Sequence, residues 1–175
     1  QGDWVKIGCQ SMLIGRKWGL AGIDCRNAAE PRIRPTAMFM GLYSRHHGKE
    51  RLRIEISSMP TYSQPLRINS IAPEPRVALV DVVATAGGQK VYLHLINRSI
   101  DQIVPVNVEL DGFTAAIRSA ELHSMSGPVT RIDDKQSVMI KHRNLKTGTA
   151  SLRIELPARS VSVAVLQLQQ KEDDE

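Results

Sequence analysis

Apolar and polar residues alternate over several short stretches that begin after residue 50. Residues 51–57 read Arg-Leu-Arg-Ile-Glu-Ile-Ser, and residues 152–156 repeat the same two-residue period. Such alternation places apolar side chains on one face of an extended strand and polar side chains on the other. The pattern predicts a half-buried antiparallel strand at both positions.

The stretch between residues 77 and 96 gives the clearest prediction of a strand pair. Residues 77–84 form a nearly continuous apolar run interrupted by Asp81, which is typical of a central strand. Gly87-Gly88 follows as a turn, and residues 90–96 alternate again, so we expect a β-hairpin. Asp81 is expected to be a hydrogen-bonded structural carboxylate.

Further short strands are predicted from the remaining apolar repeats. They cover residues 104–110, 116–125, 138–140 and 161–168. Pro105 lacks an amide hydrogen, so the first of these strands should tolerate an edge position. The apolar phase of the last strand changes near Val165, which indicates a β-bulge. Residues 59–65 contain two prolines that cannot donate to a ladder, and we expect them to be irregular.

The first 33 residues follow a different pattern. Residues 3–14 place apolar side chains at helical spacing behind Asp3, a suitable N-cap, which predicts a helix. This segment is too short to form a core of its own, so it should pack either against a missing partner or on the domain that follows. Residues 35–44 are mostly apolar without clean alternation and fit a buried strand or a short helix.

Together these elements predict an all-β fold. Roughly eight to ten short strands, with no sustained helix after residue 34, favour an antiparallel β-sandwich or jelly roll with a short N-terminal helical segment. The missing crossover helices exclude a parallel α/β topology. We expect a helical or linker segment over residues 1–33, a β-sandwich domain over residues 34–168 and a disordered acidic tail over residues 169–175.

Composition and charge limit the classes of function. With 175 residues, 42% of them apolar, the chain is large enough for one domain with a substantial core. The net charge of +5 suits a polyanion partner, but the arginines are mixed with apolar and acidic neighbours and aromatic residues are only 4% of the chain. We therefore expect no nucleic-acid partner, and we interpret the basic residues as solvated strand faces.

The sequence gives little information about compartment. No apolar run is long enough to cross a bilayer, and the first residues lack the layout of a signal peptide, so we expect a soluble chain without a membrane partner. Its localisation is left open. Cys9 and Cys25 lie in no Cys-x-x-Cys motif, and two buried thiols are favoured over a disulfide. Asn97 begins a glycosylation sequon, a three-residue match that often arises by chance.

Motifs for catalysis or cofactor binding do not stand out. His46-His47 is the only local pair of histidines, while His94, His123 and His142 lie on separate predicted elements without the spacing of metal ligands. Neither a Gly-x-Ser-x-Gly turn nor a glycine-rich phosphate loop occurs. We assign no metal, no cofactor and no catalytic residue.

Five short motifs follow one another between residues 30 and 168. They are Arg34-Pro35-Thr36 leading to Phe39 and Leu42-Tyr43-Ser44; Met59-Pro60-Thr61-Tyr62; Val80-Asp81-Val82-Val83-Ala84-Thr85; Leu95-Ile96-Asn97-Arg98-Ser99; and Leu156-Pro157-Ala158-Arg159-Ser160-Val161. In order and spacing they resemble the C-terminal part of retaining α-L-arabinofuranosidases of the glycoside hydrolase family 51 type. Each motif alone is weak, whereas five in register are fairly specific.

The resemblance implies an architecture and a partner. In that family a (β/α)8 barrel carries the chemistry, and a C-terminal jelly roll packs beside it. Residues 3–28 would correspond, with a loose match, to the last barrel helix and the connection into the jelly roll. The family has an aromatic-rich stretch where this chain has residues 37–41. The family jelly roll also takes a strand from the N-terminus of the enzyme, and its absence here should leave an exposed sheet edge.

The resemblance also bears on catalysis. Retaining glycosidases use two carboxyl groups about 5 to 5.5 Å apart. In the family both are barrel glutamates, the first preceded by an asparagine, and this sequence contains no Asn-Glu pair. Glu55, Glu109 and Glu155 are expected on polar strand faces instead. We therefore expect this chain to be inactive by itself.

Two functions from different classes follow. The favoured one is a non-catalytic accessory domain that packs against the catalytic (β/α)8 barrel of an enzyme acting on arabinan or arabinoxylan. The alternative is a carbohydrate-binding module that acts alone, which would need exposed aromatic rings. Trp18 and Tyr62 are the candidates for contact with carbohydrate or with the neighbouring domain. A third possibility is self-association through the unpaired edge or the apolar N-terminal segment.

Overall fold

The chain folds mainly into antiparallel strands. A computed structural model describes residues 13–16, 21–113, 115–127 and 138–169, and places one helix and thirteen strands within them. The chain divides into two compact units, Gln1–Ser44 and Arg45–Glu175. The all-β class predicted from the sequence is confirmed.

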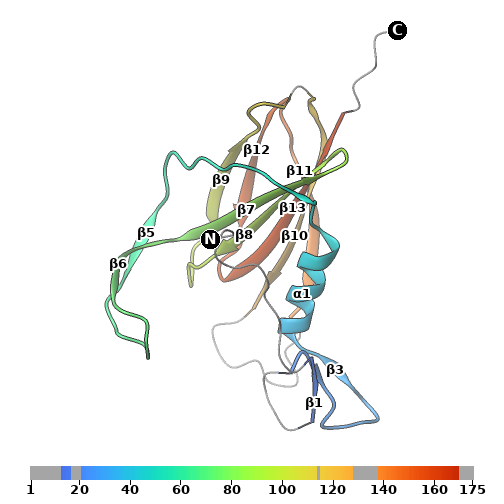
Figure 1. Ribbon diagram of the computed structural model, residues 1–175, viewed down its shortest axis with the longest axis vertical. Helices are drawn as coiled ribbons and strands as arrows, with labels where there is room; N and C mark the ends of the chain where they lie inside the picture. Colours follow the sequence, from blue (N-terminus) through green and yellow to red (C-terminus); the bar gives the residue numbers. More distant parts are fainter. Residues whose placement is uncertain (1–12, 17–20, 114, 128–137, 170–175) are drawn as a thin grey trace. The chain divides into compact units, whose positions relative to one another are not determined.

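A six-stranded antiparallel sheet forms the centre of the second unit (Figure 1). Its strands are β4 (Glu50–Arg51), β7 (Val80–Gly87), β8 (Lys90–Asn97), β10 (Ile117–Ser126), β11 (Ile140–Leu145) and β13 (Ser160–Leu168). Across the sheet they lie in the order β11-β10-β13-β8-β7-β4. The two innermost strands, β13 and β8, are rich in apolar and β-branched residues, which favour extended strands.

The predicted hairpin is confirmed as β7 and β8. The two strands pair from Val80 opposite Asn97 to Gly87 opposite Lys90, so only two residues form the turn. Gly88 has a φ of 58° there, a left-handed conformation that glycine adopts without steric cost. The apolar run over residues 77–84 is divided between two strands at Leu79, however, and only its second part belongs to the central sheet.

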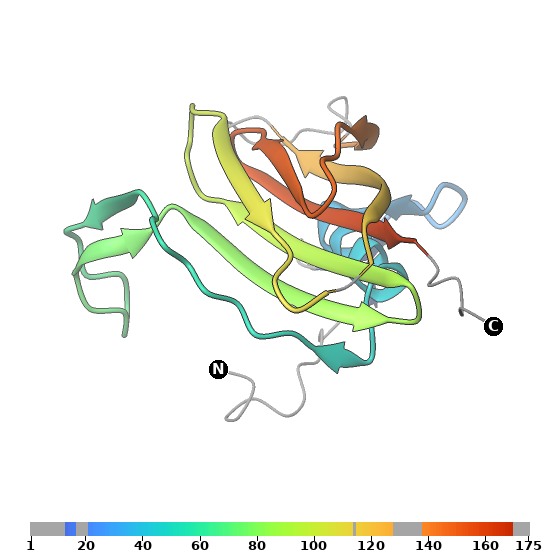
Figure 2. The ribbon, with the colours of Figure 1, turned by 90° about the horizontal axis from the view of Figure 1, so that it is seen from above.

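A second layer consists of β9 (Val104–Glu109) and β12 (Ser151–Leu156), which pair with each other (Figure 2). Leu152, Ile154 and Leu156 alternate with exposed polar residues and are buried. They belong to one apolar core with residues of the large sheet such as Leu95 and Leu166. Two sheets with an apolar core between them make a β-sandwich.

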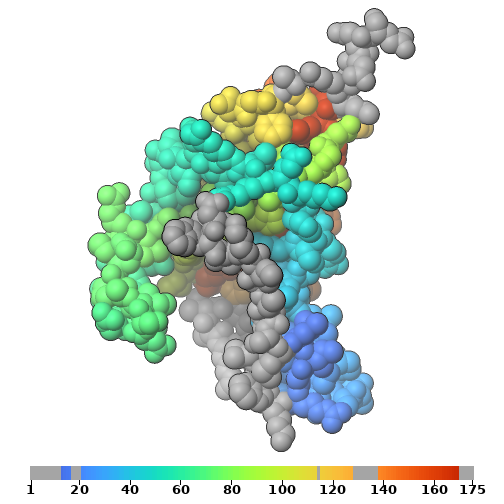
Figure 3. All heavy atoms as spheres, in the orientation of Figure 1, coloured from blue at the N-terminus to red at the C-terminus, as the bar shows by residue number. Residues whose placement is uncertain are grey.

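The arm, β5 (Thr61–Gln64) and β6 (Glu74–Ala78), corrects one prediction. Residues 59–65 were expected to be irregular, yet Thr61 and Tyr62 pair with Ala78 and Val77. The prolines of that segment flank β5, so no ladder bond is lost. The arm projects from the rest of this unit (green in Figure 3), and its loop exposes Leu66, Ile68 and Ile71.

The strand predicted over residues 51–57 is wrong beyond its first residue. Only Glu50 and Arg51 pair with β7, and the Leu52 amide makes one further bond, 3.0 Å to the Ala84 carbonyl oxygen. The chain then runs outside any strand, with Ile56 55% exposed. Alternation predicts a two-faced segment but not that a sheet is present to cover its apolar face.

Two predictions near the C-terminus need smaller corrections. The strand expected at residues 138–140 is β11, which begins only at Ile140 and continues to Leu145. The bulge expected near Val165 is not there, because β13 pairs with β8 without interruption. The register shift lies instead on the neighbouring strand β10, between Ile117 and Ser119.

The first unit combines a small sheet with α1 (Pro35–Arg45). Its strands are β1 (Ile14–Gly15), β2 (Ile23–Asp24) and β3 (Arg32–Ile33). Residues 35–44 are therefore helical, and Pro35 opens the helix at a position where its missing amide hydrogen costs nothing. The helix predicted over residues 3–14 lies largely outside the described residues, and its end is wrong because Ile14 is in β1, paired with Ile23.

No helix within the described ranges has both the length and the apolar content needed to cross a membrane.

Candidate functional site

Of the two aromatic residues predicted to contact carbohydrate or a neighbouring domain, Trp18 and Tyr62, the structure describes only Tyr62. Trp18 lies outside the described residues. Tyr62 lies on β5, opposite Val77, and is 38% exposed. In α1, the rings of Phe39 and Tyr43 lie one helical turn apart with centroids separated by 4.4 Å, so each covers part of the other. Tyr62 is thus the aromatic candidate whose ring is accessible.

A groove runs along the outer edge of β7, with a volume of about 460 Å³. It is lined by Arg51, Leu52, Arg53, Ile54, Ile56, Val82, Val83 and Ala84. The irregular segment after β4 forms one wall and β7 forms the other. Because β4 covers only Thr85 and Ala86, residues 80–83 of β7 have no strand on this side within the described residues.

The groove combines exposed apolar side chains with an ion pair. Ile54, Ile56 and Val83 expose large apolar side chains there. The one acidic side chain of the same segment, Glu55, is held by Arg53 at 2.6 Å, and both are highly exposed.

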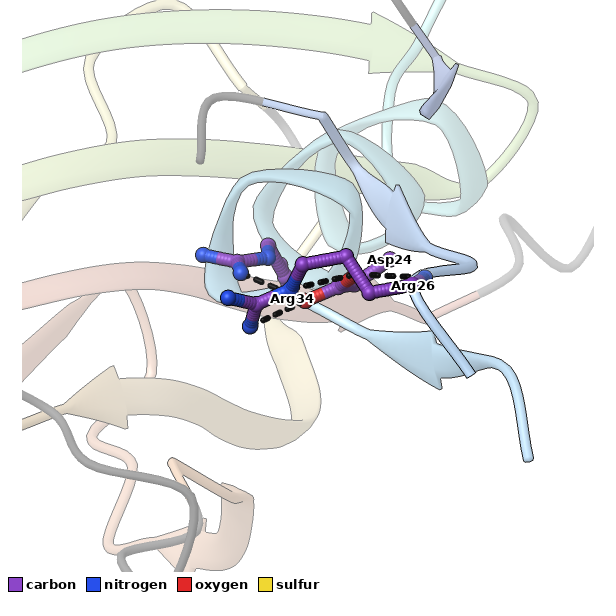
Figure 4. Close-up of polar contacts among 3 residues, drawn as sticks. All are labelled: Asp24, Arg26 and Arg34. Carbon is purple, nitrogen blue, oxygen red and sulfur yellow. Dashed lines mark hydrogen bonds and ion pairs between the residues drawn. The ribbon is translucent and has the colours of Figure 1, made fainter. Parts of the chain in front are cut away.

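Asp24 is the centre of a polar cluster in the first unit (Figure 4). Arg26 donates from Nε to both carboxylate oxygens, at 3.1 and 2.9 Å, and from its backbone amide at 3.0 Å. Arg34 donates from Nη2 at 2.6 Å. The hydrogen bonds of Arg26, followed by that of Arg34, hold the pKa of Asp24 well below its usual range. A carboxylate so occupied links β2 to the start of α1 and is structural.

Asp81 is a structural carboxylate, as the sequence predicted. It accepts a hydrogen bond of 2.7 Å from Nη2 of Arg98, whose Nη1 donates to the carbonyl oxygen of Ala78 at 2.8 Å. This contact ties the start of β7 to the residue that follows β8. The pair is partly exposed, so its contribution to stability is small.

Asn97, the first residue of the sequon, is unsuited to modification in the folded domain. Its side chain is only 2% exposed. Its amide donates to the carbonyl oxygens of Gln102, Leu156 and Pro157 at 3.0, 3.1 and 2.9 Å, and its side-chain oxygen accepts from the Ser99 amide at 2.9 Å. All of the hydrogen-bonding groups of the side chain are used inside the fold.

The structure brings the local pair His46-His47 near the three histidines that the sequence analysis placed on separate elements. His123 lies directly opposite His142 on β11, with ring centroids 6.1 Å apart. The ring of His46 lies 4.5 Å from that of His123. His46 and His47 are also close enough to His94 to affect its pKa electrostatically. As the side chains lie, no three metal-binding groups in the described parts of the chain are arranged to hold an ion.

The pKa values of two of these histidines, His94 and His123, are lowered. Burial lowers the pKa of His94, and the positive charges of His47 and His46 lower it further. Burial also lowers the pKa of His123, followed by the charge of His46, while Glu121 at 3.5 Å partly opposes the change. Sequence spacing gave no sign of this cluster, because it depends on the register of three strands and on where the loop after α1 lies.

Comparison with solved structures shows that the fold is shared with parts of arabinofuranosidases. The GH51 α-L-arabinofuranosidase from Thermotoga petrophila RKU-1 gives a TM-score of 0.69 at 17% identity, over 85% of this chain and 32% of the other. The α-L-arabinofuranosidase from Thermotoga maritima, in an arabinose complex, gives 0.68 at 16% identity with coverage of 85% and 32%. The arabinose-bound MgGH51 α-L-arabinofuranosidase gives 0.66 at 17% identity with coverage of 87% and 22%.

These similarities establish the fold of this chain and show how much of each arabinofuranosidase it covers. The chain spans about a third or less of the length of these arabinofuranosidases, with 32% and 22% covered. No family model matches the sequence. A search of curated proteins finds no match either.

Proposed function

We propose that this chain is a non-catalytic C-terminal β-sandwich domain of an α-L-arabinofuranosidase-like glycoside hydrolase. The observation that carries the proposal is fold similarity over 85% of this chain with only 32% of a similar arabinofuranosidase covered. The five sequence motifs are its second support. In this proposal a (β/α)8 catalytic domain lies outside the 175 residues. The parent enzyme would remove terminal α-L-arabinofuranosyl residues from arabinan or arabinoxylan.

The proposal assigns a role to each part of the chain. Residues 34–168 are the accessory domain, with jelly-roll connectivity, and residues 1–33 are the connection from the barrel. The groove along β7 is the surface proposed to face the catalytic domain. Its exposed Ile54, Ile56 and Val83 would be removed from water there, which stabilises association by roughly 25 cal/mol per Å² of apolar surface. Arg51 and Arg53 would meet polar groups at the rim of the contact.

Hydrolysis of p-nitrophenyl α-L-arabinofuranoside tests the non-catalytic part of the proposal. The chain alone should release nitrophenol no faster than a heat-treated sample of the same preparation. Turnover above that control, proportional to chain concentration and retained after further purification, would mean that the active carboxyl groups lie within this chain.

Association with a separately produced catalytic domain from the same coding region tests the packing part. Titration calorimetry should give a one-to-one complex. An Ile54→Asp substitution should weaken it by at least tenfold, because a carboxylate would be buried against apolar surface. Ile103→Asp is the matched control, since Ile103 is an exposed apolar residue that does not line the groove. Equal loss in both variants would place the contact elsewhere.

The exposure of Tyr62 favours a second function, a stand-alone carbohydrate-binding module. An aromatic ring of this kind can stack on the face of a sugar. Retardation of the chain in gels containing arabinan or arabinoxylan would support that function. Tyr62→Ala should then abolish the retardation and Tyr62→Phe, which keeps the ring, should preserve it. Migration equal to that in a polysaccharide-free gel would exclude it.

A further inference from the structure

The arm formed by β5 and β6 is a two-stranded sheet of its own, separate from the two layers of the sandwich (Figure 2). In β5, Thr61, Tyr62 and Ser63 are exposed, and the first three residues of β6 are exposed as well. A sheet of only two strands is marginally stable in water unless another element covers it or extends it. The outer edges of the arm therefore decide which further strand it can accept.

The outer edge of β6 is blocked. The carbonyl oxygen of Ala78 lies on this edge, because Ala78 is opposite Thr61 in a pair without mutual hydrogen bonds. It accepts a hydrogen bond of 2.8 Å from Nη1 of Arg98. Farther along β6, Pro75 has no amide hydrogen and lies where the register of the two strands shifts. A proline and an irregular register both keep a further strand from pairing with an edge.

The outer edge of β5 is open. The Leu79 amide donates to the carbonyl oxygen of Pro60 at 2.8 Å, so the backbone groups of Pro60 and, by alternation, of Tyr62 face β6. The amides and carbonyl oxygens of Thr61 and Ser63 consequently face away from β6. Among the residues that the structure describes, no strand pairs with them. The four residues of β5 include neither a charged residue nor a proline, so nothing in the strand itself prevents further pairing.

We propose that the open edge of β5 pairs with the same edge of a second copy of this chain. A two-fold axis at Tyr62 sets Thr61 of each copy opposite Ser63 of the other, which are the residues whose backbone groups face outward. In an antiparallel ladder each such pair exchanges both of its N–H···O bonds. The two arms together form one sheet of four strands in the order β6-β5-β5-β6. This inference goes beyond the proposed function and does not rest on it.

The side chains of β5 suit this register. Tyr62 of one copy lies directly opposite Tyr62 of the other, in a pair without hydrogen bonds, where side chains of paired strands approach most closely. The Tyr62 side chain is 38% exposed and is available for such an aromatic pair, which stabilises a sheet. Gln64 lies opposite Pro60, so no like charges meet. Pro65 has no amide hydrogen and ends the ladder, which makes the contact short and the dimer weak.

Hydrogen exchange of the full 175-residue chain tests the pairing, with the amides of Thr61 and Ser63 as reporters. Their protection should rise at least threefold when the chain concentration is raised from about 20 µM to about 1 mM, as expected of a weak dimer. Amides of β12, in the other layer, should keep their protection. Unchanged protection at Thr61 and Ser63, or an equal gain in β12, would overturn the proposal. Protection that appears only when a catalytic domain is added would also overturn it, because a different partner would then cover the edge.

A matched pair of substitutions at Ser63 tests the edge itself. Ser63→Pro removes the outward-facing amide hydrogen and leaves the bonds between β5 and β6 in place, so sedimentation equilibrium at about 1 mM should give the mass of a monomer. Ser63→Ala keeps the amide and should dimerise like the unmodified chain. Equal dimerisation of both variants would contradict the proposal.

A second pair of variants replaces the first if Ser63→Pro does not fold. Tyr62→Asp sets two carboxylates opposite each other across the two-fold axis, so this variant should dimerise less than the uncharged Tyr62→Asn. Equal association of these two variants would contradict the proposed register.

Discussion

The side-chain amide of Asn97 donates a 3.1 Å hydrogen bond to the carbonyl oxygen of Leu156, joining the last residue of β8 to the last residue of β12. The two strands belong to different sheets, so this bond fixes one end of the sandwich. Two more carbonyl oxygens, of Gln102 and Pro157, accept from the same amide. One buried side chain thus joins two connecting segments, the one after β8 and the one after β12.

Replacing the side-chain amide of Asn97 should lower the free energy of unfolding. Asn97→Asp keeps the shape but sets a carboxylate against three carbonyl oxygens, and we expect a loss of about 3 kcal/mol or more in the free energy of unfolding at neutral pH. Urea denaturation measures it. Asn107→Asp, at an exposed position of β9, is the control and should change stability by less than about 0.5 kcal/mol. Similar values for both variants would contradict the role given to Asn97.

Ile154 tests the sandwich core. Its side chain is fully buried on β12, between neighbours from both sheets. Ile154→Ala should lower the free energy of unfolding by about 2–5 kcal/mol, because it removes buried methyl groups and leaves a cavity. The same substitution at the exposed Ile100 should have an effect near zero. If the two substitutions cost the same, the second layer is not packed as described.

The β7–β8 turn gives a prediction about backbone conformation. Nothing lies within 4 Å of the position that a Cβ at Gly88 would occupy, so only its φ of 58° resists substitution. Gly88→Ala should cost about 1–2 kcal/mol. Gly88→Asn should cost less, since asparagine tolerates the left-handed region. Thermal unfolding of the two variants measures the difference, and equal melting temperatures would contradict the turn geometry.

The histidines predict how stability depends on pH. The pKa values of His94 and His123 are lowered in the folded chain, so the folded state takes up fewer protons than the unfolded state below the ordinary value of 6.5. The stability that these groups contribute is therefore fully present above pH 6.5 and is lost as the pH falls through the lowered values. Urea denaturation at a series of pH values measures this slope.

A substitution isolates the contribution of one histidine. His94→Gln should flatten the decline between pH 6.5 and pH 5, whatever its effect on stability at neutral pH. Asn144→Gln should leave the slope as it is. An unchanged slope in the His94 variant would assign the acid sensitivity to other groups.

Local patterns predicted some elements of this fold and not others, for physical reasons. The hairpin at Gly87-Gly88 was predictable because turn residues and alternating strands are adjacent in sequence. Residues 51–57 carry equally clear alternation, yet only a small part pairs, because pairing depends on which strand lies alongside. The segment over residues 59–65 pairs despite its prolines, because they flank the strand.

Less of the candidate site than of the fold could be predicted from the sequence. The family resemblance predicted an exposed sheet edge but not which strand would carry it. One wall of the groove along β7 is formed by a segment that was predicted to be a strand. The cluster of His46, His123 and His142 was missed because His46 and His142 are far apart in sequence and meet His123 only through strand register and loop position. No local spacing encodes such a cluster.

Sedimentation velocity of this chain mixed with the catalytic barrel from the same coding region tests the central claim most directly. The account predicts a one-to-one complex that sediments faster than either component and that Ile54→Asp disrupts. Two independent boundaries at micromolar concentration, with the chain itself hydrolysing arabinofuranosides, would contradict it.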